Sequence, residues 1–137
     1  MTARTDDYDA IVRVVQLYID GFNDNDVGKF KEALHEDAWM FYVNADGSLY
    51  KNPVSRSFEE WATPPGWGVV GRIVSVAQVG DAAAVQLYWD RATDKSGGWI
   101  DFHNLLRITA SGRSPTSPPP TAADRFFSRG RRRRPCP

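Results

Sequence analysis

Residues 98–108 constrain the fold most strongly, because they predict one long central β-strand with two very different faces. The segment is rich in aromatic and aliphatic residues and follows a polar turn, which is typical of a strand. Side chains alternate between the two faces of a strand. Ile100, Phe102, Asn104, Leu106 and Ile108 lie on one face, whereas Trp99, Asp101, His103, Leu105 and Arg107 lie on the other. The first face is apolar apart from one amide, and the second is half polar.

The segments before this strand predict an α+β fold. Residues 8–22 form an amphipathic helix with one apolar stripe, made of Tyr8, Ile11, Val12, Val15, Tyr18, Ile19 and Phe22. A second short helix begins after Asp26, whose carboxylate can cap it, and a third follows Ser57. Strands are expected at residues 39–43, 48–51, 70–79 and 82–90, separated by turn residues. A curved antiparallel sheet of this kind needs helices on one face.

Composition and charge restrict the class of protein. The 137 residues are enough for one domain with a modest core, and 12% of them are aromatic. Residues 1–112 carry ten Lys or Arg and sixteen Asp or Glu, so this acidic body gives no reason to expect nucleic acid or membrane as a partner. No apolar run approaches the roughly 20 residues of a membrane span, and the N-terminal residues lack signal-peptide features. A cytoplasmic protein is therefore expected.

The C-terminal residues 111–137 differ from the rest of the chain. They hold six of the nine prolines and a run of arginines, and we expect this tail to be disordered. An arginine run can also bind RNA or direct nuclear import, but a solvated tail is the simpler reading. The single cysteine, Cys136, excludes an internal disulfide and is interpreted as incidental.

Three short motifs, together with the order of the elements, carry a resemblance to a known family. They are Tyr18-Ile19-Asp20-Gly21, His35-Glu36-Asp37-Ala38 and the run from Asp101 to Ile108. The chain resembles the nuclear transport factor two superfamily over residues 6–108, in particular its lumazine-binding branch near the SnoaL-like and ketosteroid-isomerase-like proteins. The resemblance implies a conical α+β barrel for residues 1–110, in which a bent antiparallel sheet wraps around the helices and leaves a deep apolar pocket. It also implies a homodimer formed through the outer face of the sheet.

The chain departs from the family pattern after Ile108, where a turn and a last strand are expected. Residues 109–117 instead read Thr-Ala-Ser-Gly-Arg-Ser-Pro-Thr-Ser. One set of codons for these residues, read one base out of register with one G restored, encodes Asp-Gly-Glu-Trp-Lys-Ile-Thr-Asn-Lys, which matches the missing strand. We therefore interpret the tail as a frameshift product, which leaves the sheet without its final strand and with an open edge.

The resemblance also suggests where chemistry can occur. Tyr18 falls at the position of the oxyanion-stabilising tyrosine of ketosteroid-isomerase-like enzymes, but Tyr42 stands where the base aspartate is expected and Asn104 where the second acid is expected. A phenol with a pKa near 10 is a poor base, so this isomerisation is disfavoured. Because Asn104 then points into the pocket, alternation turns Asp101, His103 and Arg107 toward the outer or dimer face, where they pair with neighbouring strands or a partner subunit.

Aromatic residues are the other candidates for the pocket wall, since they can stack on a flat ligand or simply fill the core. The predicted pocket comprises Tyr18, Tyr42, Phe58, Trp61, Trp89, Phe102 and Asn104. Asp101, His103 and His35 are too few and too scattered for a metal site, and the glycines near residue 68 do not match a dinucleotide fingerprint. Neither a metal nor a cofactor is expected.

Three functions remain open from the sequence. The first is a protein that binds a small aromatic or cyclic molecule, such as a pteridine, without catalysis. The second is an acid/base enzyme, isomerase-like or cyclase-like, that acts on a hydrophobic cyclic substrate with Tyr18 and Asn104. The third is a dimeric interaction module without a ligand, which a pocket filled by side chains would favour.

Overall fold

The computed structural model describes residues 5–91, 98–108 and 131–133, without the side chains of residues 6 and 131–133. The elements in chain order are helix α1 (Thr5–Asn23), helix α2 (Val27–Ala33), strands β1 (Trp39–Val43) and β2 (Leu49–Pro53), the 3-10 turn η1 (Val54–Ser57), helix α3 (Phe58–Trp61), and strands β3 (Val69–Val79), β4 (Ala82–Arg91), β5 (Trp99–Leu106) and β6 (Arg131–Arg133). The predicted α+β class is confirmed, and the predicted helices and strands before residue 108 are all found.

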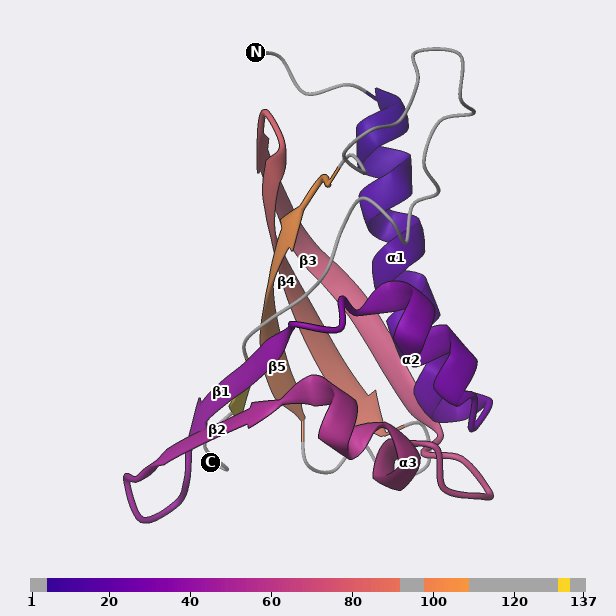
Figure 1. Cartoon of the computed structure of the whole chain (residues 1–137), viewed down its shortest axis with the longest axis vertical. Helices are drawn as coiled ribbons and strands as arrows, with labels where there is room; N and C mark the ends of the chain where they lie inside the picture. The colour runs from indigo at the N-terminus through magenta and orange to yellow at the C-terminus, as the bar shows by residue number, and fades with distance from the viewer. Residues whose placement is uncertain (1–4, 92–97, 109–130, 134–137) are drawn as a thin grey trace.

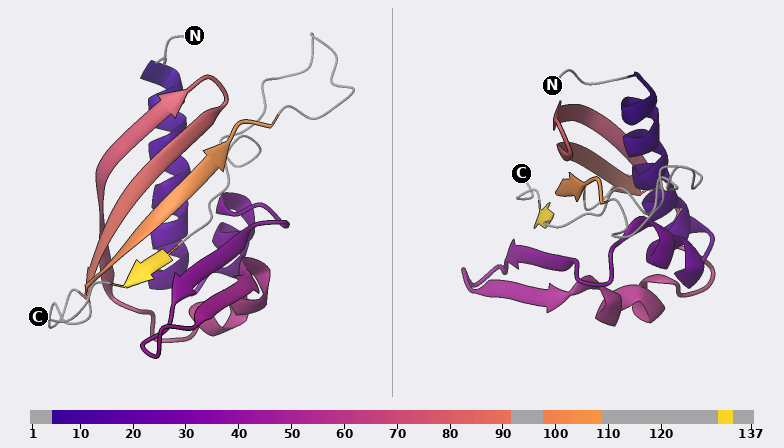
Figure 2. Two further views of the ribbon diagram at one scale, coloured as in Figure 1. Left: turned by 90° about the vertical axis from the view of Figure 1, so that its left-hand side faces the viewer. Right: turned by 45° about the horizontal axis from the view of Figure 1, so that its top comes forward.

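The strands form two antiparallel sheets (Figure 1). One has the order β3-β4-β5-β6, and the other is the β1–β2 hairpin. Helix α1 runs along one face of the larger sheet, and the hairpin lies with α3 at the lower end of the molecule (Figure 2). Within the described residues no strand pairing joins the two sheets, so the cone is an open barrel rather than a closed one.

Helix α1 is held on the sheet by its apolar stripe. Ile11, Val15 and Ile19 are buried as the periodicity predicts, whereas Tyr8 is 50% exposed and does not belong to the stripe. The helix can approach strand β3 closely because Gly71 has no side chain. A Cβ atom at that position would lie 2.6 Å from Ile19 Cδ1, well inside van der Waals contact.

The two short helices begin differently from one another. The side chain of Asp26 caps α2, since its Oδ1 accepts from the N–H of Lys29 at 3.3 Å. The predicted cap of α3 by Ser57 is not made, because η1 leads directly into the helix and the Ser57 side chain makes no capping bond. Both helices bury aromatic side chains under the sheet, namely Phe30, Phe58 and Trp61.

A β-bulge shapes strand β3. Its register with β4 shifts between Ile73 and Ser75, and Val74 is left exposed at this point. Up to Ile73 the inward side chains have odd numbers, whereas after the bulge Val76 and Gln78 are the more buried ones. A bulge also bends its strand, which helps the sheet to curve around α1.

Strand β5 presents the opposite face to the interior from the one expected. Asp101, His103 and Leu105 are almost completely buried, whereas Phe102 and Leu106 are 45% and 44% exposed. Their register partners on β4 agree, because Leu87 and Val85, opposite Asp101 and His103, are buried as well. The alternation of the strand was predicted correctly, but the placement of Asp101 and His103 on the outer face is wrong.

The C-terminal part of the chain is described only in part. The backbone of Arg131–Arg133 forms β6, which pairs with β5 at Trp99–Asp101. The rest of the predicted disordered tail, including Cys136 and the segment interpreted as frameshifted, lies outside the described residues. Among the helices that are described, none has the length and apolar character needed to cross a membrane.

Candidate functional site

A buried polar cluster lies between α1 and the sheet, and we call it the Asp101 cluster. Its members are Tyr18 from α1, Trp89 from β4, and Asp101 and His103 from β5. Each of the four side chains is at least 95% buried. They meet because the helical stripe brings Tyr18 over the sheet, while alternation turns the other three side chains toward it.

The carboxylate of Asp101 is the centre of this cluster. The indole Nε1–H of Trp89 donates to Asp101 Oδ2 at 2.7 Å, and the Tyr18 hydroxyl donates to the same oxygen at 3.3 Å. Asp101 itself is only 1% exposed. Burying a carboxylate is costly unless hydrogen bonds compensate it, and these two donors come from elements far apart in the sequence.

His103 completes the cluster. Its Nε2 lies 3.8 Å from Asp101 Oδ2, which is ion-pair distance if the imidazole is protonated. The imidazole ring also packs edge-on against the ring of Tyr18, with 4.9 Å between their centroids. A carboxylate, an imidazole and a phenol in one dry site can bind a polar group or move a proton. In the described part of the chain, no group of three or more His, Cys, Asp or Glu residues could hold a metal ion.

Aromatic rings surround the Asp101 cluster. The ring of Tyr18 lies 5.2 Å from that of Phe22 and 6.1 Å from that of Trp61, and both contacts are between buried residues. Phe30 stacks on Phe58 at 5.6 Å behind them. These rings pack against one another and fill the space under the sheet where a pocket was predicted.

A small cavity lies at one end of this aromatic core. It has a volume of about 10 Å³ and is lined by Phe22, Trp67, Val69, Trp89 and Trp99. This volume accommodates about one water molecule, whereas pockets for small molecules measure roughly 300–1,000 Å³. A ligand larger than water therefore needs a side chain to move.

The predicted pocket residues fall into two groups. Tyr18, Phe58, Trp61 and Trp89 are buried in the same aromatic core, and of these four Trp89 also lines the small cavity. Tyr42 is half-buried on the β1–β2 hairpin, where its ring stacks on that of Tyr50 at 4.2 Å. Phe102 and Asn104 are exposed on the opposite face of the sheet, so the structure does not bring Asn104 together with Tyr18.

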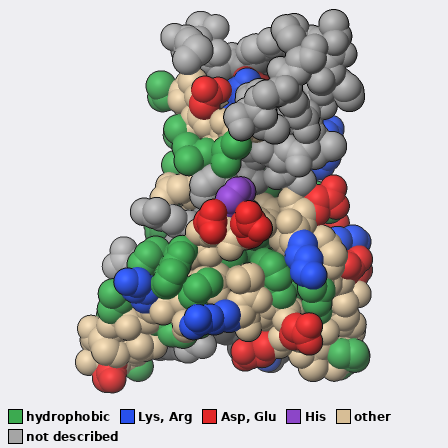
Figure 3. Space-filling view, viewed as in Figure 1, with side chains coloured by type: hydrophobic (Ala, Val, Ile, Leu, Met, Phe, Trp, Pro, Cys, Tyr) green, Lys and Arg blue, Asp and Glu red, His purple; other side chains and the backbone are tan. Residues whose placement is uncertain are grey.

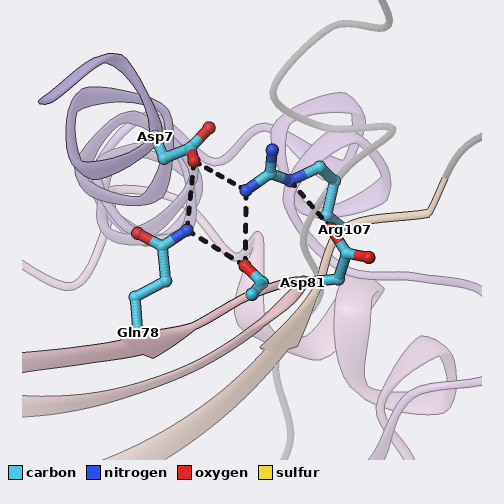
Figure 4. Close-up of polar contacts among 5 residues, drawn as sticks. Asp7, Gln78, Asp81 and Arg107 are labelled. Carbon is cyan, nitrogen blue, oxygen red and sulfur yellow. Dashed lines mark hydrogen bonds and ion pairs between the residues drawn. The ribbon is translucent and has the colours of Figure 1, made fainter. Parts of the chain in front are cut away.

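The predicted outer-face residues were also partly misplaced. Asp101 and His103 belong to the interior, as described above. Arg107 is half-buried at the edge of the sheet, where it pairs with Asp7 from α1 at 2.7 Å and with Asp81 at 3.5 Å (Figure 4). Arg107 was predicted to pair with a neighbouring strand or a partner subunit, whereas the described partners are a helix residue and a turn residue of the same chain. The hydrogen bond from Trp89 to Asp101 was not predicted, because nothing in the sequence indicates which acceptor an indole N–H will find.

The hairpin differs from the interior in exposing its apolar side chains. Val43, Leu49 and Trp39 are 67%, 63% and 36% exposed. The space-filling view shows hydrophobic side chains over this hairpin with Lys or Arg among them (Figure 3). The amino group of Lys51 lies 5.4 Å from the centre of the Trp39 ring, as in a cation–π contact.

A family profile described as "Putative lumazine-binding" matches residues 6–108, which is most of the chain. The chain belongs to this family. The match covers α1 to β5 and therefore includes every residue of the Asp101 cluster. No curated protein matches the sequence.

Solved structures of other proteins show the same fold. An NTF2-like protein of unknown function from Shewanella baltica OS155 is similar with a TM-score of 0.75 and 22% identity, over 100% of this chain and 99% of that one. An NTF2-like protein of unknown function from Methylobacillus flagellatus KT has a TM-score of 0.69 and 20% identity, over 96% and 93% of the two chains. A domain with a cystatin-like fold from Nostoc punctiforme PCC 73102 reaches 0.64 with 13% identity, over 96% and 78%. These likenesses establish an NTF2-like, cystatin-like fold.

Proposed function

We propose that this lumazine-binding family member binds a small aromatic or cyclic molecule under its sheet, with Asp101 as the polar anchor. The observation that carries the proposal is the burial of Asp101 with two donors, Trp89 and Tyr18, in the middle of an aromatic core. The family name and the earlier prediction of a pteridine-like ligand agree with it. Pockets of this kind combine apolar walls with a few converging polar groups.

The cost of a buried carboxylate supports a role in binding. A well-packed apolar residue at the same place is often neutral or more stable, so a buried charge is weak evidence for a purely structural role. Buried titratable groups with specific partners gather at functional sites. Asp101 can accept a hydrogen bond from a ring N–H of a ligand, while Tyr18 and Trp61 offer flat or edge-on ring contacts.

A ligand screen tests this proposal directly. The purified protein is examined by native mass spectrometry for a co-purified molecule, and by thermal shift with lumazine, flavin precursors and other aromatic metabolites. We expect lumazine-like compounds to raise the Tm of the wild type, and Asp101→Asn to weaken their binding at least about tenfold, since a hydrogen bond to a charged group contributes roughly 1.5–3 kcal/mol. Asp37→Asn, which changes an exposed carboxylate, is the control. A ligand that binds Asp101→Asn as tightly as the wild type contradicts the proposal.

The second candidate, an acid/base enzyme, is favoured by His103 beside Asp101. With a cyclic ketone in the site, the Asp101 carboxylate, with His103 beside it, would accept the proton from the carbon next to the carbonyl. The electron pair of that C–H bond would form the new C=C bond, and the π pair of the carbonyl would move to its oxygen. The Tyr18 hydroxyl would then donate its hydrogen bond to the enolate oxygen instead of to Asp101. Asn104, which the sequence suggested for this role, is exposed on the other face and is not available.

Deuterium exchange tests this candidate. The exchange of the ring protons next to the carbonyl of 2-tetralone in D₂O is followed by NMR. We expect the wild type to accelerate it and Asp101→Asn to lose about a hundredfold, as is typical when a general base is removed. Tyr18→Phe should lose less. If Asp101→Asn exchanges these protons as fast as the wild type, the hypothesis of an acid/base enzyme is wrong. The hypothesis of ligand binding without catalysis is then unaffected.

We further propose that the exposed face of the larger sheet forms a homodimer. A dimer is also the basis of the third, ligand-free hypothesis, which the side-chain-filled space under the sheet favours by the criterion stated above. Its exposed apolar side chains are Val70, Val74, Phe102, Leu106 and Ile108. An apolar patch of this kind is typical of an interaction surface. Sedimentation analysis should show a dimer that the double substitution Phe102→Asp and Leu106→Asp dissociates, whereas Val43→Asp, on the separate β1–β2 hairpin, leaves it intact. Cytoplasmic localisation stays a prediction of the sequence.

A further inference from the structure

Trp67 is the side chain that differs from the other rings around the small cavity. It lies in the loop between α3 and β3, whereas Phe22 belongs to α1 and Trp89 and Trp99 belong to paired strands. Phe22 and Trp89 are fully buried, whereas Trp67 and Trp99 are half-buried. Of the two half-buried rings, Trp99 is held in a paired strand, so Trp67 is the one whose backbone can move without breaking a helix or a sheet.

The loop around Trp67 is fixed at both of its ends. On one side the Thr63 hydroxyl donates to the carbonyl of Glu60 at 2.6 Å. On the other side the amide of Asn23 makes two bonds of 2.8 Å with the backbone of Val69, one to its N–H and one to its carbonyl. Between these anchors the N–H of Trp67 donates to the carbonyl of Phe22 at 3.2 Å.

The neighbours of Trp67 allow its backbone to turn. Gly66 and Gly68 both have positive φ values, 103° and 57°, in the region where glycine is most at ease. Loop segments that absorb such dihedral changes are the usual hinges of ligand-induced closure. The two anchors would keep the ends of the loop in place while the Trp67 ring moves out and back.

The space beneath Trp67 leads to the Asp101 cluster. The Trp67 ring packs edge-on against Phe22, with 5.2 Å between centroids, and the cavity that they share also touches Trp89. The indole N–H of Trp89 binds Asp101. Along β5, Trp99 and Asp101 share the inward face, so the cavity and the cluster occupy successive positions under the sheet.

We propose that the Trp67 indole occupies the place of the ligand's ring when no ligand is bound, so that the site takes a planar bicyclic aromatic molecule of about the size of an indole. This inference rests on the proposed function and deepens it, because it names both the entry point and the shape of the ligand. Binding exchanges one flat ring for another between Phe22, Trp89 and Trp99. The polar edge of the ligand then faces Asp101.

Two probes and three variants test the inference. Indole reports only the space that Trp67 leaves, whereas lumazine reports that space and the Asp101 cluster together. In Trp67→Ala we expect indole to bind at least about tenfold more tightly than in the wild type, because the competing side chain is gone and an apolar cavity can accept an aromatic guest. Trp67→Phe, which should fold even if Trp67→Ala does not, should show a smaller gain. The control is Trp39→Ala, on the hairpin, which should leave both affinities unchanged.

The outcomes separate this inference from the proposed function. If indole and lumazine bind Trp67→Ala and Trp67→Phe no better than the wild type, the role of Trp67 is wrong, even where Asp101→Asn still weakens lumazine. If indole gains in both Trp67 variants but Asp101→Asn leaves lumazine binding unchanged, the place of the ring is right and the Asp101 anchor is wrong. Equilibrium dialysis measures the dissociation constants of indole and of lumazine for each variant.

Discussion

Two carboxylates are buried among the described residues, and they have different partners. Asp7, at the start of α1 and 4% exposed, accepts from the guanidinium of Arg107 at 2.7 Å and from the amide of Gln78 at 3.2 Å (Figure 4). Asp101 accepts from the neutral donors Trp89 and Tyr18. We call the first group, completed by Asp81, the Asp7 cluster.

The difference between the two clusters indicates a difference in role. Arg107 joins α1, the β3–β4 turn and the end of β5, since it also binds the carbonyl of Gly80 at 3.4 Å. A carboxylate beside a cation of this kind stabilises the fold as an ion pair. Among the contacts described, the Asp101 carboxylate accepts from an indole and a phenol, and an imidazole lies 3.8 Å away. Buried titratable groups with specific partners gather at functional sites, which is why we assign Asp101 to the proposed ligand site. The following predictions test this contrast.

The largest effect is expected from Arg107→Leu. It leaves Asp7 buried without its cation, and breaking a buried pair typically costs about 3–5 kcal/mol of unfolding free energy. Because Arg107 is partly exposed, we expect a loss at the lower end, about 3 kcal/mol. Urea unfolding measures it. The double variant Asp7→Leu and Arg107→Leu should recover part of the loss. An unchanged midpoint in Arg107→Leu would mean that the Asp7 cluster contributes nothing to stability.

The next effect is expected from Tyr18→Phe. It removes one donor from Asp101 while the ring contacts remain, so we expect a loss of about 1.5 kcal/mol, at the low end for a bond to a charged group because this bond is 3.3 Å long. Tyr8→Phe, on the exposed side of the same helix, is the control and should be neutral. Equal stability of the two variants would show that the Tyr18 hydroxyl does not stabilise Asp101.

Asp101→Asn should change stability less than Tyr18→Phe does. The amide oxygen can still accept from Trp89, and the cost of burying a charge disappears, so we expect a change within about 1 kcal/mol in either direction. Ligand binding should nevertheless fall, as stated above. A loss of about 3 kcal/mol, as for Arg107→Leu, would make Asp101 a structural residue and remove the contrast between the two clusters.

The smallest effect is expected from salt. At 1 M NaCl the screening length falls to about 3 Å, which weakens the partly exposed contact between Arg107 and Asp81. We expect the unfolding free energy of the wild type to fall by less than about 0.5 kcal/mol through this screening, because exposed ion pairs contribute little to stability. Arg107→Leu should lose this sensitivity, whereas Asp101→Asn should keep it. Comparing urea midpoints at low and high salt measures the difference.

The sequence predicted the elements well because their signals are local. The apolar period of α1, the Asp26 cap and the turn residues around Gly47 depend on neighbours within a few positions. The capping of α3 by Ser57 failed for a local reason too, since the preceding residues continue as a 3-10 turn. Strand ends were within two residues of those observed.

The site was only partly predictable because its contacts are not local. Tyr18 and Asp101 are 83 positions apart, and nothing near Asp101 in the chain shows that a tyrosine and an indole will donate to it. The family position of Asn104 instead suggested the opposite orientation of β5. The hypothesis of a frameshift concerns residues 109–117, which lie outside the described residues, and it stays a prediction. Sequencing of the gene checks it, and an intact frame without a missing base contradicts it.

The single extra residue in β3 connects the two clusters. Before Val74 the odd-numbered residues face α1, so Gly71 lies where Ile19 can settle near the Asp101 cluster. After it the parity is reversed, and Gln78 rather than Val79 turns inward to reach Asp7. Without the bulge, simple alternation along the same residues would turn Val79 toward α1 and the amide of Gln78 into solvent. The bulge at Val74 thus lets one strand pack beside the Asp101 cluster at one end and contribute to the Asp7 ion-pair cluster at the other.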